Sequence, residues 1–183
     1  MNNSADKYRS FLSYILIFLG TFLVMQIVIG TAMIPSHSMD PTLTVGKKYL
    51  FFQQAYLFSD PKRGDIIVFD DFDQKSGGQA SEESQRTIFC KRIIGVPGDV
   101  IDFKDEAVYI NGEKLDEPYA YGVTIPLVRS DENGDPYIAD HFEVPEGHYF
   151  FMGDNRENSH DSRLWKPQPF IEKSQILGKL IVF

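Results

Sequence analysis

The strongest pattern along the chain is one long uncharged, apolar stretch near its N-terminus. No charged residue lies between Ser10 and Ser36, and Phe11–Ile29 is almost wholly apolar. A bilayer core needs about 20 such residues, whereas the apolar region of a cleavable secretory signal has about 7–15. No small-x-small site followed by a polar mature start is evident. We therefore predict a permanent transmembrane helix over residues 10–31, preceded by a polar tail at residues 1–9.

Beyond this stretch the pattern changes to short runs of β-branched and aromatic residues separated by turn residues. Such runs predict β-strands, and Asn111–Gly112 between two of them predicts a tight hairpin. Many short strands with regular turns are typical of barrels and sandwiches. The predicted fold class is mainly β, with the transmembrane helix followed by an antiparallel β-barrel-like domain over residues 32–183. The predicted strands are Tyr49–Phe52, Asp65–Phe69, Ile88–Ile94, Val100–Phe103, Val108–Asn111, His148–Met152 and Ile176–Phe183.

Three segments interrupt the β pattern. Thr31–Pro41 carries two prolines, so we expect a loop there rather than continuous helix. Residues 73–87 are polar and rich in Gly and Ser, which predicts a mobile surface loop. Residues 113–142 combine prolines with Asp, Asn and Gly turns, and we expect them to form a small cap on the main domain.

The aromatic run Tyr49–Phe58 has two interpretations. The one we prefer is a strand that is buried on both of its faces. The other is an apolar surface that contacts the membrane, because exposed apolar patches mark partners or lipid.

Composition narrows the classes of function. The chain has 183 residues, which suits one domain with a short appendage. The formal net charge is −8 and no cluster of Lys and Arg occurs, so we expect no nucleic-acid partner. The single cysteine cannot form an internal disulfide, and no Cys/His group has the spacing of zinc ligands. We therefore expect a fold that needs neither disulfide nor metal.

The first segment with candidate chemistry, residues 34–43 (IPSHSMDPTL), directly follows the predicted helix. A serine hydroxyl in it can act as a nucleophile when a base removes its proton. Serines beside prolines also form turns and cap helices. This segment alone does not establish a catalytic serine.

The second segment, residues 89–99 (FCKRIIGVPGD), places a lysine inside a strand pattern. Phe89, Lys91 and Ile93 alternate onto one face of that strand. If this face points inward, burial lowers the pKa of the amine from about 10.4 and provides a neutral general base near pH 7. On an edge strand the same lysine faces solvent and protects against aggregation. Taken alone, this segment favours the solvent-exposed lysine.

The third segment, residues 153–163 (GDNRENSHDSR), follows the predicted strand His148–Met152. Its Asp and Arg residues predict a polar turn held by hydrogen bonds and ion pairs. Such a turn can hold neighbouring loops in place, whether or not it has a catalytic role.

Together, these segments resemble the motifs of the bacterial type I signal peptidases, which are Ser–Lys serine proteases. The Pro-Ser-x-Ser-Met-x-Pro-Thr-Leu motif is present at Pro35–Leu43, and a Gly-Asp-hydrophobic strand follows at Gly64–Phe69. The Lys-Arg motif with Gly-x-Pro-Gly-Asp is present at Lys91–Asp99, and the Gly-Asp-Asn-x-x-x-Ser-x-Asp-Ser-Arg motif at Gly153–Arg163. All four occur in the family's order. The resemblance covers the anchor and the main β domain but not the two insertions, residues 73–87 and 113–142.

The resemblance implies a membrane-anchored serine endopeptidase that removes signal peptides from exported preproteins at small-x-small (Ala-x-Ala) sites, with no metal or other cofactor. It implies Ser38 as the nucleophile and Lys91 as its general base, with the Ser36 hydroxyl and the Ser38 N–H as the oxyanion hole. Ser159 would orient the Lys91 amine. The resemblance further implies supporting roles for Arg92, Asp154, Asp161 and Arg163, and a substrate pocket lined by Ile34, Met39, Leu43, Phe89 and Cys90.

The resemblance also determines the location that we expect. The positive-inside count is weak evidence, because lysines or arginines lie on both sides of the predicted helix. A signal peptidase would cross the bacterial cytoplasmic membrane once, with its N-terminus in the cytoplasm and its catalytic domain outside. The expected partners are signal peptides and the lipid bilayer, and we expect a monomer.

Two histidines offer a different mechanism. His37 stands where many family members have a small residue, and His160 stands at a variable position of the third motif. Either suggests a Ser–His–Asp triad, but sequence neighbours rarely form one because adjacent side chains diverge. We expect structural roles for His141 and His148.

Three other functions compete with the signal peptidase. One is a specialised peptidase for a single secreted or pilin precursor, and another is a noncatalytic membrane-anchored β module that binds exported chains. The third is a self-cleaving Ser–Lys protease of the repressor type. Such repressors carry a DNA-binding module, and no basic helix-turn-helix pattern occurs in this sequence.

Overall fold

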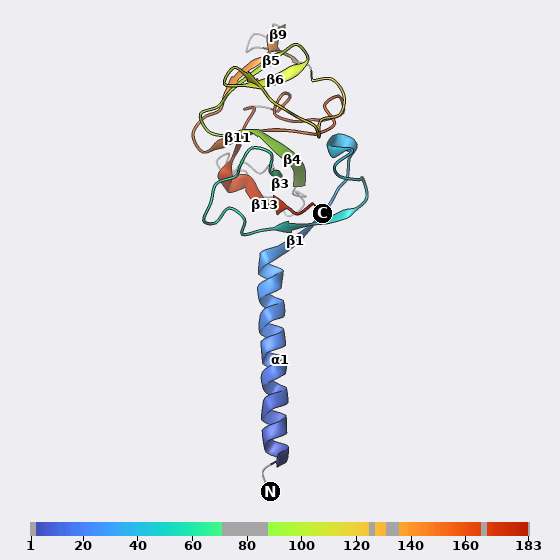
Figure 1. The fold of residues 1–183 in the computed structure, drawn as a ribbon, viewed down its shortest axis with the longest axis vertical. Coiled ribbons are helices and arrows are strands. Elements are labelled where there is room, and N and C mark those ends of the chain that lie inside the picture. Colours follow the sequence, from blue (N-terminus) through green and yellow to red (C-terminus); the bar gives the residue numbers. More distant parts are fainter. Residues whose placement is uncertain (1–2, 71–87, 125–126, 131–135, 166–167, 183) are drawn as a thin grey trace.

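A long helix and a β-rich domain make up the molecule. The computed structural model describes residues 3–70, 88–124, 127–130, 136–165 and 168–182. The helix, α1 (Asn3–Val28), projects away from the domain (Figure 1). The described residues form sheets of seven, four and two strands, and every paired strand in them is antiparallel. The prediction of a mainly β antiparallel fold behind one N-terminal helix is confirmed.

The large sheet, which has seven strands, begins directly at the end of α1. Its strands, in spatial order, are β1 (Ile29–Met33), β2 (Lys48–Phe52), β13 (Ile176–Leu180), β3 (Ile66–Asp70), β4 (Ile88–Gly95), β11 (His148–Met152) and β12 (Ile171–Glu172). Every residue of β3 is buried. β3 is therefore the central and most deeply buried strand of the sheet, as its nearly continuous apolar sequence requires.

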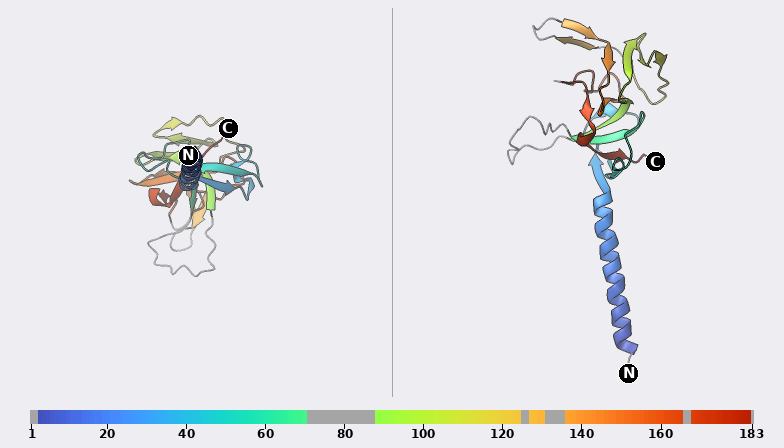
Figure 2. Two further views of the ribbon diagram at one scale, coloured as in Figure 1. Left: turned by 90° about the horizontal axis from the view of Figure 1, so that it is seen from below. Right: turned by 90° about the vertical axis from the view of Figure 1, so that its left-hand side faces the viewer.

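The cap sheet, which has four strands, lies on the side of the large sheet away from α1 (Figures 1 and 2). Its strands, in spatial order, are β10 (His141–Glu143), β5 (Val100–Lys104), β6 (Ala107–Ile110) and β7 (Glu113–Lys114). The predicted turn at Asn111–Gly112 joins β6 to β7, and its two residues have φ values of 53° and 84°, as such a turn requires. The cap thus starts at Val100, earlier than the expected residue 113, because β5 and β6 pair with β10 and β7.

The remaining elements are short. They are the strands β8 (Leu127–Ser130) and β9 (Pro136–Ala139), and the 3₁₀ turns η1 (His37–Met39) and η3 (Lys173–Gln175). β8 and β9 pair with each other and lie far from α1 (Figure 2).

The buried apolar side chains of the domain gather in three clusters, and β4 contributes to all of them. Ile94 packs in the cluster between the large sheet and the cap sheet. Cys90 packs in the cluster beneath β1, β2 and η1. Ile93 packs on the opposite face with Ile67 and Phe151. Side chains along a strand alternate between its faces, so β4 connects all three parts of the core.

The helix α1 differs from the expected bounds at both ends. It begins at Asn3, within the expected tail, because the residues before residue 10 include no Gly or Pro that would stop it. It ends at Val28 because Ile29–Met33 pair with β2. The loop expected from Thr31 therefore starts only after Met33. In the part of the chain that the structure describes, no helix is long and apolar enough to cross a membrane.

The preferred interpretation of the aromatic run, a strand buried on both faces, is wrong. In β2 only Phe51 is buried, while Leu50 and Phe52 are exposed. The reason is that β2 lies next to β1, at the edge of the large sheet, where only one face is covered. Beyond the strand, Phe58 is 95% exposed. The mobile loop predicted at residues 73–87 lies outside the described residues.

Candidate active site

The proposed nucleophile lies in a single 3₁₀ turn that follows β1. η1 holds Ser38 in a buried position, while Ser36, just before the turn, is exposed. The Ser36 Oγ donates a hydrogen bond to the Ser38 Oγ at 3.3 Å. The turn packs against β4. It therefore presents two hydroxyl groups side by side next to the strand that carries Lys91.

Lys91 occupies the middle of β4, between β3 and β11, and is only 3% exposed. The solvent-facing edge-strand interpretation is therefore wrong, since neighbours on both sides complete the sheet. Burial lowers the pKa of the Lys91 amine from 10.5 to about 8, although the charge of Asp161 opposes this shift. Among the described residues, the amine has no hydrogen-bond partner. A neutral amine is thus accessible near neutral pH.

Gly153 brings the third segment against the serine turn. A Cβ atom at this position would collide with the Ser38 carbonyl oxygen and with the Ser159 Oγ, so only glycine allows this approach. The next residues complete the contact: the Asn155 N–H donates to the Ser38 carbonyl oxygen at 3.0 Å, and the Asn155 Nδ2 donates to the His37 carbonyl oxygen at 3.1 Å. The third segment therefore holds the backbone of the turn.

The hydroxyl of Ser159 lies against Gly153 and is buried. Within the described part of the chain, it is the only side-chain nitrogen or oxygen atom that is fully inaccessible to solvent and has no hydrogen-bond partner. Leaving a buried polar group unpaired costs about 1–3 kcal/mol. Unpaired groups of this kind occur where a catalytic role requires them.

Asp161 and Arg163 stabilise the third segment, as expected for a polar turn held by hydrogen bonds and ion pairs. The fully buried Asp161 carboxylate accepts hydrogen bonds from the Gly153 N–H at 3.1 Å and from the Arg163 Nε at 2.8 Å. The Arg163 guanidinium also donates to the Arg156 carbonyl oxygen at 2.7 Å. Paired charges and backbone bonds thus fix the position of Gly153.

Asp154 joins the first and second segments to the third. Its carboxylate accepts two hydrogen bonds from Arg92, at 2.8 Å and 2.7 Å, and one from the Thr42 Oγ1 at 2.5 Å. The third nitrogen of Arg92, Nη1, donates to the Gly64 carbonyl oxygen at 2.9 Å. This bidentate geometry fixes direction as well as distance, so the three segments meet at one buried carboxylate.

The structure gathers four of the five expected pocket residues. Ile34, Met39, Leu43 and Cys90 are buried in the same cluster beside the Ser38 turn. Phe89 lies in another cluster, on the opposite face of β4 from Cys90, and packs on Trp165 with ring centroids 5.0 Å apart. Burial raises the pKa of the Cys90 thiol to about 11, so the thiol stays protonated near neutral pH.

The histidines lie on the surface. The His37 Nδ1 pairs with Asp40 at 2.6 Å, and the His160 ring lies 5.7 Å from that of Trp165. On the cap, His141 pairs with Asp102 at 2.7 Å. Within the described residues, no hydrogen bond joins Ser38 to His37, His160 or Lys91. Burial, rather than an existing bond, is what distinguishes Lys91 from the histidines as a candidate base.

Sequence reasoning did not assign roles to Thr42, Gly153, Asn155 or Arg156. Gly153 had a recognisable signal, because a glycine directly after a strand often marks a close approach of two backbones. Thr42 and Asn155 lie inside the recognised segments but carry no signal of their own. Their partners lie more than 100 residues away along the chain.

Known proteins resemble this chain over most of its length. The family model described as signal peptidase, peptidase S26, matches residues 7–183. The chain is 35% identical over 149 residues to "Probable signal peptidase I-2" of Synechocystis sp., which covers 81% of this chain and 60% of that protein. It is 35% identical over 143 residues to signal peptidase I of Bacillus licheniformis, and the match covers 77% of this chain and 68% of that protein. It is 31% identical over 172 residues to signal peptidase IB of Staphylococcus aureus, covering 87% and 79%. The chain therefore belongs to the type I signal peptidases of the peptidase S26 family, the enzymes that remove signal peptides.

Proposed function

We propose that this chain is a membrane-anchored serine endopeptidase that removes N-terminal signal peptides from exported preproteins at small-x-small sites such as Ala-x-Ala. One observation carries the proposal: the Lys91 amine is buried without a hydrogen-bond partner among the described residues, on the strand against which the Ser38 turn packs. A desolvated lysine can serve as a base for serine without a histidine.

In the acylation step, the Ser38 Oγ attacks the carbonyl carbon of the last signal-peptide residue while the Lys91 amine takes its proton. The negative charge moves onto the carbonyl oxygen, where the Ser36 hydroxyl and the Ser38 N–H donate hydrogen bonds. Each such donor contributes about 10²–10³-fold to the rate. The peptide C–N bond then breaks, the Lys91 ammonium gives its proton to the leaving amine, and an ester on Ser38 remains.

In the deacylation step, the same Lys91 amine takes a proton from water, and the hydroxide oxygen attacks the ester carbonyl. The C–O bond to Ser38 breaks, and the proton returns to the Ser38 Oγ. With a pKa of about 8, the amine is neutral in about a tenth of the molecules at pH 7. We propose that the Ser159 hydroxyl, which is otherwise unpaired, directs the amine.

The preference for small side chains follows from the apolar cluster beside Ser38. Ile34, Met39 and Leu43 are at most 2% exposed and fill the space around the turn with large side chains. A shallow apolar surface accepts alanine, while a larger side chain would have to displace well-packed atoms. The departure of Phe89 from this cluster removes it from the proposed pocket.

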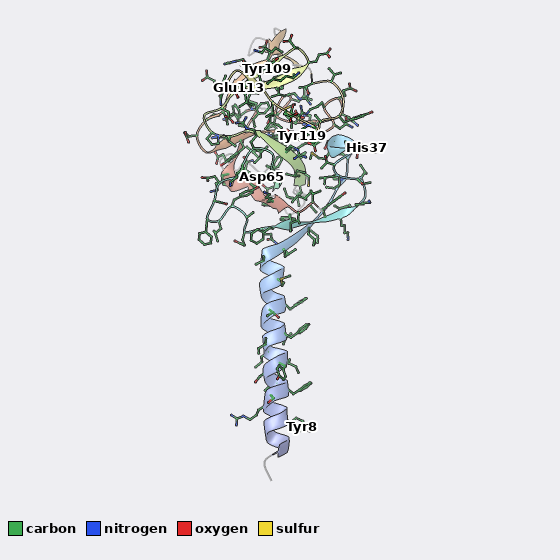
Figure 3. All side chains as sticks on the ribbon, viewed as in Figure 1. Tyr8, His37, Asp65, Tyr109, Glu113 and Tyr119 are labelled. Atoms are coloured by element: carbon green, nitrogen blue, oxygen red, sulfur yellow. The ribbon has the colours of Figure 1, made fainter. Side chains whose placement is uncertain are left out.

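The proposal of membrane anchoring is supported by the exposed apolar surface of α1 and by exposed apolar residues near β2. Residues 10–22 of α1 are all exposed and carry no charge, and no other described element covers them (Figure 3). A contiguous exposed apolar surface such as this one marks contact with a partner or with lipid. The exposed Leu50, Phe52 and Phe58 lie on and after β2, which pairs with the strand that α1 enters. We propose a single-pass arrangement with the domain outside the cytoplasm, acting as a monomer that receives a signal peptide from the bilayer.

The test is cleavage of several Ala-x-Ala precursors by washed membranes from cells that express the full chain. We expect cleavage by the wild type, loss to background in Ser38→Ala, and unchanged cleavage in Ser59→Ala. Among the described residues, the Ser59 hydroxyl bonds only to the Ala55 carbonyl, which makes it a suitable control. Activity confined to one precursor would indicate a specialised peptidase. No cleavage of any precursor would favour a noncatalytic binding module, and activity released by washing would contradict the anchor.

A further inference from the structure

A segment of the cap runs alongside the third segment of the site and is hydrogen-bonded to it. This segment, Glu117–Thr124, is called the strap below. The Tyr121 N–H donates to the Asp154 carbonyl oxygen at 2.8 Å, and the Arg156 N–H donates to the Tyr121 carbonyl oxygen at 2.9 Å. Tyr121 thereby forms an isolated parallel bridge with Asn155. The strap is therefore paired with the same backbone that holds the Ser38 carbonyl.

Arg156 links the strap to Gly153 through a buried guanidinium group. Its side chain is fully buried, and its two terminal nitrogens donate to the Glu117 carboxylate, one of them at 2.9 Å. One of these nitrogens also donates to the Thr124 Oγ1 at 2.9 Å, and the Nε donates to the Gly153 carbonyl oxygen at 3.0 Å. Removing the partner of such a buried charge is strongly unfavourable, so Glu117 determines where Arg156 can lie.

Tyr119 makes a second contact, on the side of the site that carries the base. The guanidinium carbon of Arg92 lies 3.9 Å from the centre of the Tyr119 ring, and the Tyr119 hydroxyl donates to Glu117 at 3.1 Å. In Figure 3, Tyr119 lies at the level of His37, next to the nucleophile, while Glu113 of β7 lies further from α1. The strap thus touches two of the three cations that secure the third segment, Arg92 and Arg156.

We propose that the strap positions the serine turn for catalysis, with Glu117 and Tyr119 as positioning residues that act through Arg156 and Arg92. This inference rests on the proposed function, because it assigns to the cap a role in that same reaction. The physical path is short: Glu117 holds Arg156, Arg156 holds Gly153 and pairs with Tyr121, and the adjacent Asn155 holds the Ser38 carbonyl. A misplacement of about 1 Å at a reacting group can cost about 10²-fold in rate.

The kinetic test compares Glu117→Gln with Glu113→Gln in the full-length enzyme. Glu113 is an exposed carboxylate of the same cap with no ion pair among the described residues, which makes it a matched control. We expect kcat of Glu117→Gln to fall by about 10²-fold, with KM for a short Ala-x-Ala peptide changed less than about twofold. Assays well below the unfolding temperature of every variant exclude a loss of folded enzyme. Equal kcat in the two variants would overturn the proposal.

A second measurement does not depend on cleavage at all. Hydrogen exchange of the Asn155 amide reports directly on its bond to the Ser38 carbonyl. We expect faster exchange in Glu117→Gln and Tyr119→Leu, and unchanged protection in Glu113→Gln and Tyr119→Phe, which keeps the ring over Arg92. Full protection in Glu117→Gln would contradict the coupling. If the wild type failed to cleave, the proposed function would fail, while the exchange data would still decide whether the strap holds the turn.

Discussion

Lys91 and Arg92 are neighbours in β4, but their side chains enter two different regions of the molecule. One region offers hydrogen-bond partners to a positive charge, and the other does not. Arg92 enters a polar region, where it meets the Asp154 carboxylate, the Gly64 carbonyl and the ring of Tyr119. Lys91 enters an apolar region opposite Ile67 of β3 and finds no hydrogen-bond partner among the described residues. The Arg92 guanidinium group is therefore fully hydrogen-bonded, whereas the Lys91 amine is buried without such bonds among the described residues.

This difference separates a structural cation from the side chain that we propose as the general base. A guanidinium group that is fully paired keeps its charge and fixes the geometry around it. A buried amine without partners loses its charge more easily, and a perturbed pKa in such a place marks a functional group. The comparison therefore predicts that the two side chains have opposite effects on stability.

The largest effect is expected from breaking the polar region. Arg92→Met leaves the Asp154 carboxylate buried without its bidentate partner, which should lower the free energy of unfolding by about 3–5 kcal/mol. Denaturant unfolding of the full chain in detergent measures this, with Lys114→Met on the exposed β7 as the control. A change within about 0.5 kcal/mol, as at ordinary surface positions, would show that the pairing does not matter.

Replacing the neighbouring Lys91 should raise the free energy of unfolding rather than lower it. The fall in the Lys91 pKa from 10.5 to about 8 means that burying the charged amine costs about 3 kcal/mol. Lys91→Met removes this cost, so we expect the variant to be more stable than the wild type near pH 7 by up to that amount. A variant less stable than the wild type would mean that the amine has a stabilising partner in the folded protein.

The difference in unfolding free energy between Lys91→Met and the wild type should also depend on pH, which gives a sharper test of the burial of the amine. Because the folded pKa is below the unfolded one, the unfolded chain binds more protons between about pH 8 and pH 10.5, and wild-type stability rises with pH in that window. The advantage of Lys91→Met should therefore be nearly full below about pH 8 and reduced to about half near pH 9.2. An advantage that stays constant with pH would contradict the burial of a titrating amine.

Local patterns in the sequence predicted most of the strands but not which of them would be interior. His148–Met152 is a strand with the bounds that its aromatic residues indicated, and Asn111–Gly112 makes the expected turn. The orientation of Lys91 could not be decided in the same way. It depends on β3 and β11 pairing with the two edges of β4, and neither partner leaves a mark in residues 89–99.

The same limit applies to the site. The motifs placed Ser38, Lys91 and Ser159 near one another only through a resemblance, since no spacing rule connects residues more than 50 positions apart. The strap was hidden altogether, because Glu117 and Tyr119 look like ordinary polar loop residues. Their significance comes from Arg156 and Arg92, which only the folded chain brings to them.

The most direct test of a neutral Lys91 as the base is the pH dependence of precursor cleavage by the wild type, Lys91→Met and His37→Ala. We predict that kcat/KM of the wild type rises with pH to a plateau with its midpoint at about 8, as the amine loses its proton. His37→Ala should follow the same curve, and Lys91→Met should show no cleavage at any pH despite a folded structure. Wild-type cleavage by Lys91→Met, with loss in His37→Ala, would contradict the account and make His37 the base.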